Sequence, residues 1–121
     1  MNKHALRAQD YLGHMLEAIK RIGRYTQDLT EAAFIESEMV QDAVIRNFEI
    51  IGEAARNIER DSPAFAAQHA DIPWTLIYTM RNRVAHGYFS VDLEIVWKTI
   101  RRDLPGLAEQ IDRLLNDIRK A

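Results

Sequence analysis

The chain has 121 residues, 47% of them hydrophobic and 28% charged, with a formal net charge of -2. This composition is ordinary for a folded protein, so we expect residues 1–121 to form a single domain, and intrinsic disorder is excluded. The absence of cysteine excludes disulfides, thiolate metal sites and a cysteine nucleophile. No apolar run is long enough to span a membrane and the first residues lack a signal-peptide core, so we expect a cytoplasmic protein.

Hydrophobic residues recur at helical spacing in the first half of the chain. They predict helices over Lys3–Tyr25 and Glu38–Arg60, the second about 35 Å long, with Thr30 capping a short turn between them. The predicted buried stripes are Leu12, Met15, Leu16, Ile19 and Ile22, then Val40, Val44, Phe48, Ile51, Ala55 and Ile58. The second stripe is widened by Met39, Ala43, Ile50 and Ala54. Such a wide arc suits either the central helix of a bundle or a helix that also meets a second protomer.

The second half is punctuated by residues that start and stop helices. Ser62-Pro63 opens a short segment to about His69, and Asp71-Ile72-Pro73 precedes a helix over Trp74–Ala85 that Gly87 ends or interrupts. Ser90 or Asp92 caps a helix to about Arg101, and Asp103-Leu104-Pro105 starts the last helix, with Leu107, Ile111, Leu114, Leu115 and Ile118 as its stripe. No segment alternates with period two, so the prediction is an all-α antiparallel bundle of five or six helices without strands.

The segment from Trp74 to Phe89 concentrates chemically useful side chains. On a helix, its predicted core side carries Leu76, Ile77, Met80 and Val84, and the other side carries Tyr78, Arg81, Asn82 and His86. Tyr88 follows the glycine. An exposed polar face is usually only solvated, and that reading stands beside the functional one. The imidazole can move protons near neutral pH, and the guanidinium can bind a phosphate and stabilise charge on it.

Those two groups together could cleave RNA without a metal. His86 would take the 2'-hydroxyl proton and Arg81 would neutralise the phosphate in the transition state. One histidine supplies a base but no separate acid, and a symmetric dimer would provide the second copy. The net acidity requires Arg81, Arg83, Arg46 and Arg56 to gather in one groove.

Arg81-Asn82-Arg83-Val84-Ala85-His86-Gly87-Tyr88 resembles the Arg-x4-His-x-Tyr signature of the HEPN superfamily, and more closely its HepT branch, the toxins of HEPN/MNT toxin–antitoxin pairs. The likeness covers nearly the whole chain. Its other matching segments are Asp42–Ala54, Ile72-Pro73-Trp74, Val96-Trp97 and Asp103-Leu104-Pro105.

This resemblance implies an all-α HEPN-like domain that dimerises near the motif and acts as a metal-independent endoribonuclease. It implies that Arg81 and His86 are catalytic, with Asn82 in support. It also implies that an MNT nucleotidyltransferase partner neutralises the toxin by transferring AMP to Tyr88.

The remaining polar and aromatic residues were weighed for other roles. The histidines (His4, His14, His69 and His86) are scattered, so we expect neither a metal site nor a cofactor. Trp74 and Phe89 are expected in the core or an interface, whereas Tyr78 is open to stacking on a base. The charged stripe of the Glu38–Arg60 helix predicts a solvated face with paired charges. Its members are Arg46, Glu49, Glu53, Arg56 and Arg60. Arg46 is the exception and is predicted to bind RNA, as is Arg83.

The alternative function is a non-catalytic helical module. In that case the same basic and polar face docks a nucleotidyltransferase or a nucleotide without cleaving RNA.

Overall fold

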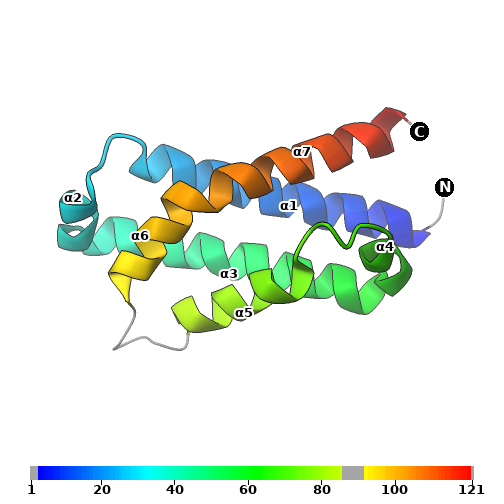
Figure 1. Ribbon diagram of the computed structural model, residues 1–121, viewed down its shortest axis with the longest axis horizontal. Helices are drawn as coiled ribbons and strands as arrows, with labels where there is room; N and C mark the ends of the chain where they lie inside the picture. Colours follow the sequence, from blue (N-terminus) through cyan, green and yellow to red (C-terminus); the bar gives the residue numbers. More distant parts are fainter. Residues whose placement is uncertain (1–2, 86–91, 121) are drawn as a thin grey trace.

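A computed structural model describes the backbone of residues 3–85 and 92–120, and the side chains of residues 7–79 and 92–120. These residues form α-helices and no strand, which confirms the predicted all-α class (Figure 1). The helices are α1 (Lys3–Thr26), α2 (Glu31–Glu36), α3 (Glu38–Asp61), α4 (Pro63–Gln68), α5 (Trp74–Ala85), α6 (Leu93–Arg102) and α7 (Leu104–Lys120). Within the described ranges the helices number seven rather than five or six, because both short segments, α2 and α4, close into six-residue helices.

The long helices α1 and α3 lie side by side through the middle of the bundle. α7 packs along α1, α5 packs along α3, and α6 contacts both α2 and α7. The start of α1 and the end of α7 lie at the same end of the bundle, as Figure 1 shows. Because α5 packs along α3, the Arg81–Tyr88 segment begins next to α3.

Side-chain caps set several of the helix starts. Thr30 accepts a hydrogen bond from the Ala33 amide at 3.1 Å, as predicted, and Asp92 accepts from the amides of Glu94 and Ile95. Asp92 is therefore the N-cap of α6. Ser62 occupies the N-cap position before Pro63, but its side chain makes no capping hydrogen bond.

The predicted apolar stripes form the core. Leu12, Met15, Phe48, Ile51 and Ile111 are at most 1% exposed. Leu16, Val40 and Ile118 are partly buried against this core. Two of the residues that widen the predicted α3 stripe differ in exposure: Ala54 is buried, whereas Met39 is 81% exposed.

The C-terminal end of α1 is tied to α6 by one arginine. Arg101 donates hydrogen bonds to the carbonyls of Thr26 and Leu29 at 2.8 and 3.0 Å, and so satisfies acceptors at the end of α1. Its guanidinium lies 4.4 Å from the centre of the Trp97 ring, which also packs on Phe34 of α2. These contacts fix the position of α6 against the end of α1 and against α2.

The buried face of α5 differs from the prediction at Leu76. Trp74 and Ile77 are 5% and 3% exposed, whereas Leu76 is 63% exposed, so its assignment to the core is wrong. Each helical residue turns by about 100°. Because Trp74 and Ile77 share the buried face, Leu76 points away from it. Met80 and Val84 were assigned to the same face, and their side chains lie outside the described residues.

Trp74 anchors the start of α5, and its substitution gives a first prediction. Its indole N–H donates to the carbonyls of Ala66 and His69 at 3.1 and 3.2 Å. We expect Trp74→Phe to lower the free energy of unfolding by about 1–3 kcal/mol through lost hydrogen bonding and packing. Leu76→Ala, on the same helix but exposed, should change it by less than about 0.5 kcal/mol. Urea denaturation followed by circular dichroism tests both values, and equal losses would contradict this assignment of faces.

Candidate functional site

The predicted catalytic segment starts in the last turns of α5. Arg81, Asn82 and Arg83 lie within this helix, which continues to Ala85. The helical backbone assumed for these positions is therefore present. Their side chains lie outside the described residues, as do His86 and Tyr88 in full, together with Phe89.

Two hydrogen bonds establish how α5 is aligned against α3. Arg56 donates to the Tyr78 hydroxyl at 2.6 Å, and Thr75 donates to a Glu59 carboxylate oxygen at 3.0 Å. From the second pair to the first, the chain moves forward on α5 from 75 to 78 and backward on α3 from 59 to 56. Equal steps in opposite directions are expected for antiparallel helices of equal rise. Extending this alignment along α5 brings position 81 level with position 53, and position 85 level with position 49. The start of the motif thus runs beside the middle of α3.

Tyr78 lies one helical turn before Arg81 and is half-buried between α3 and α5. The Arg56 guanidinium carbon is 5.0 Å from the centre of its ring, a cation–π distance. The sequence predicted that Arg56 lines an RNA groove. In the structure Arg56 contacts α5, the helix on which the Arg81–Tyr88 segment begins. Stacking of Tyr78 on an RNA base remains a prediction.

The charged stripe of α3 is a solvated surface, as predicted. Arg46 lies 3.5 Å from a Glu49 carboxylate oxygen, with their side chains 70% and 37% exposed. Arg60 turns instead to its neighbour Asp61 at 3.0 Å. The hydrogen bond from Arg60 lowers the pKa of the Asp61 carboxyl below its usual value. An exposed pair of this kind adds little to stability.

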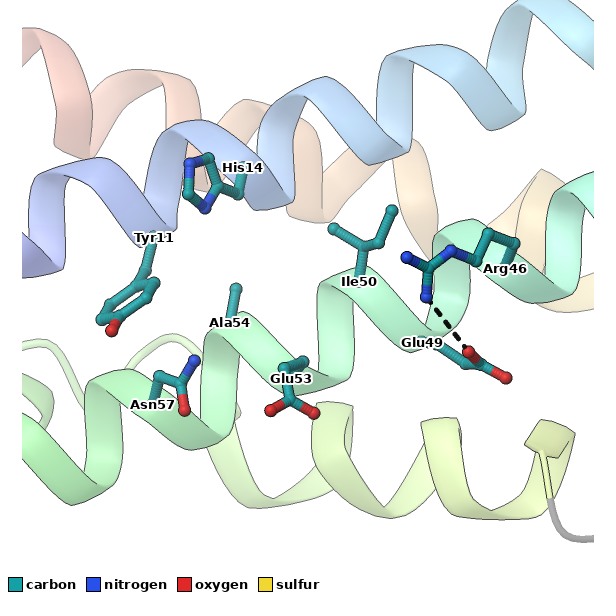
Figure 2. A pocket seen from close by; sticks show the side chains of 8 residues that line it. All are labelled: Tyr11, His14, Arg46, Glu49, Ile50, Glu53, Ala54 and Asn57. Atoms are coloured by element: carbon teal, nitrogen blue, oxygen red, sulfur yellow. Dashed lines mark hydrogen bonds and ion pairs between the residues drawn. The ribbon is translucent and has the colours of Figure 1, made fainter.

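Arg46 also lines a cavity of about 270 Å³ between α1 and α3 (Figure 2). Ile50 and Ala54 belong to the α3 wall of this cavity, and Tyr11 and His14 come from α1. The full lining is Tyr11, His14, Arg46, Glu49, Ile50, Glu53, Ala54 and Asn57. Sequence reasoning did not connect the α1 residues to this region. Their spacing of three residues places Tyr11 and His14 on one face of α1, but the sequence does not indicate which helix packs against that face.

Among the residues whose side chains are described, no group of three or more histidine or acidic residues is arranged to hold a metal ion. In the same part of the chain, no helix is both long and apolar enough to cross a bilayer.

Comparison with known proteins gives concordant matches. The family model described as Ribonuclease HepT-like matches residues 15–114. A protein of Methanocaldococcus jannaschii named "Gamma-glutamylcyclotransferase and putative RNase" is 41% identical over 110 residues, which are 91% of this chain and 48% of that protein. The chain thus spans about half of that relative. A protein of Thermococcus cleftensis named "Probable ribonuclease HepT" is 40% identical over 106 residues, 88% of this chain and 94% of the relative. No solved structure matches.

Proposed function

The chain belongs to the HepT-like ribonuclease family, and we propose that it is a metal-independent endoribonuclease in which Arg81 and His86 act on the scissile phosphate. The supporting observation is the family match, which spans residues 15–114 and therefore includes the Arg81–Tyr88 segment. The alignment of α5 along α3 supports the same proposal, because it sets the start of this segment beside a polar, charged surface.

The reaction needs a base, an acid and a group that binds the phosphate. The His86 imidazole takes the proton of the 2'-hydroxyl, whose oxygen then attacks the adjacent phosphorus. The bond to the 5'-oxygen breaks, and that oxygen receives a proton, leaving a 2',3'-cyclic phosphate and a 5'-hydroxyl. The Arg81 guanidinium stabilises the charge on the phosphate oxygens, and Asn82 orients the histidine or the phosphate.

The acid that protonates the 5'-oxygen comes, in this proposal, from a second copy of the chain. A symmetric homodimer that brings two motifs together supplies two imidazoles and two guanidiniums to one RNA strand. One imidazole then acts as the base and the other as the acid.

We further propose that the protein is the toxin of a toxin–antitoxin pair whose partner is an MNT-type nucleotidyltransferase. The partner neutralises it by AMP transfer: the Tyr88 phenol gives up its proton, its oxygen attacks the α-phosphorus of ATP, and pyrophosphate leaves. The added phosphate carries negative charge beside the RNA path, so it repels the substrate backbone as well as blocking it.

Incubation of the purified chain with total tRNA and a structured RNA, in parallel with and without a chelator, tests the nuclease proposal. We expect cleavage that leaves 2',3'-cyclic phosphate ends. Loss of cleavage when metals are chelated would contradict the metal-independent mechanism. No cleavage by a folded and unmodified sample would favour the binding module that docks a nucleotidyltransferase or a nucleotide.

The contribution of Arg83 to RNA binding gives a separate prediction. A guanidinium that neutralises one phosphate releases bound counterions, so Arg83→Ala should reduce the slope of log affinity against log salt by about 0.7. Fluorescence anisotropy with a labelled single-stranded RNA, in a His86→Ala background, measures this slope without cleavage. Arg119→Ala near the end of α7 is the matched control, and an equal change there would remove the assignment to Arg83.

A further inference from the structure

The cavity between α1 and α3 combines an apolar wall with a charged rim. Ala54 is buried, and with Ile50 it contributes the apolar part of the α3 wall. On the α1 side the rings of Tyr11 and His14 meet edge to face, with their centres 6.2 Å apart and their planes at 76°. Figure 2 shows His14 above the α3 wall and Arg46 at one end. A flat ring with apolar faces and a polar edge suits such a site.

The charged rim has a specific hydrogen-bonding pattern. Arg46 and Glu49 are paired at 3.5 Å, so a donor group and two carboxylate acceptors lie next to each other. Glu53, one helical turn beyond Glu49, adds a second carboxylate to the lining.

We propose that this cavity is a nucleobase subsite that binds guanine in the RNA substrate. The Watson–Crick edge of guanine presents one acceptor, O6, followed by two donors, N1–H and the N2 amino group. Arg46 can donate to O6 while Glu49 accepts from the two donors, which matches the pair in both sign and order. Adenine offers only one donor position on this edge, and uracil offers one N–H between two carbonyls that a carboxylate repels.

The size of the cavity favours one base over a whole nucleotide. A cavity of about 270 Å³ lies just below the usual range for small-molecule sites of about 300–1,000 Å³, so it suits a single ring system better than a whole nucleotide. Cytosine presents one donor and two acceptors on this edge, so the Glu49 carboxylate would receive a hydrogen bond from only one of its groups.

The cavity also lies at a suitable distance from the proposed cleavage site. Glu49 and Glu53 line it from α3, and the same two positions are level with positions 85 and 81 of α5. The axes of packed helices are about 8–10 Å apart, so an RNA strand that reaches α5 also passes close to α3. This inference rests on the proposed ribonuclease function for its substrate, because the base would belong to a nucleotide near the cleaved bond.

Binding of short RNAs that cannot be cleaved tests the subsite independently of catalysis. We would use 2'-O-methyl hexanucleotides that differ only in one central base, with GMP as a competitor. The unmodified protein should bind the guanine oligonucleotide at least about fivefold more tightly than the other three. Glu49→Gln should abolish this preference, because an amide replaces one acceptor with a donor. Glu59→Gln, the same change on α3 outside the cavity, should keep it.

The possible outcomes separate the subsite from the nuclease. Equal binding of all four oligonucleotides, a preference for cytosine, or a guanine preference that survives Glu49→Gln would each overturn the subsite. Competition by GMP at concentrations similar to the oligonucleotide would show that the cavity takes a free nucleotide and would overturn the assignment to RNA. A guanine preference without any cleavage of natural RNA would support the subsite while contradicting the proposed function.

Discussion

Replacing His86 with alanine is expected to lower RNA cleavage by about 100- to 10,000-fold, the usual contribution of a general acid or base. In the proposed dimer the loss removes both proton-transfer groups at once, so the upper part of this range is expected. RNA affinity should change little, because Arg81 and Arg83, the proposed phosphate-binding residues, are still present. Initial cleavage rates on tRNA, measured with chelator present, give the first value, and anisotropy with an uncleavable RNA gives the second.

His69→Ala is the matched control for this experiment. His69 follows α4, and its ring packs on Phe65 with centres 4.6 Å apart. It precedes α5, whereas His86 follows that helix, which is about 18 Å long. The control should retain cleavage. A His86→Ala variant that unfolds would assign this histidine a structural role, and a folded variant with full activity would remove it from the mechanism.

Replacing Tyr88 with phenylalanine is expected to abolish AMP labelling by the partner nucleotidyltransferase while leaving cleavage largely intact. The substitution removes only the phenol oxygen, which is the proposed nucleophile toward ATP. Under the proposed pairing, cells that carry both genes should then lose protection, because the proposed toxin can no longer be modified. Incorporation of labelled AMP into the purified chain and growth on co-expression with the partner measure the two effects.

Tyr25→Phe provides the control for the labelling experiment. Tyr25 is 41% exposed near the end of α1, so it is accessible to a modifying enzyme. Its loss should leave labelling unchanged. Continued labelling of Tyr88→Phe, or loss of labelling in Tyr25→Phe, would place the acceptor elsewhere.

The helices and their buried faces were predictable because their signals are local. The stripes of α1, α3 and α7 follow from the 3.6-residue period, and Thr30 caps α2 through an amide three residues away. Leu76 shows the limit of this reasoning. Its spacing fitted a core face, but in a short helix two faces can fit the same period, and packing against neighbouring helices decides between them.

The segment Arg81–Tyr88 could likewise be proposed from the sequence, because its residues are adjacent in the chain and resemble a family signature. The contact of Arg56 with Tyr78, and the presence of Tyr11, His14 and Arg46 around one cavity, were not predictable. Those residues come from different helices, and their proximity depends on which helices pack together and in what alignment. The helices, most of their buried faces and the family were thus predictable from the amino-acid sequence. Which polar side chains share a surface depends on how the helices pack together, so only the folded structure shows it.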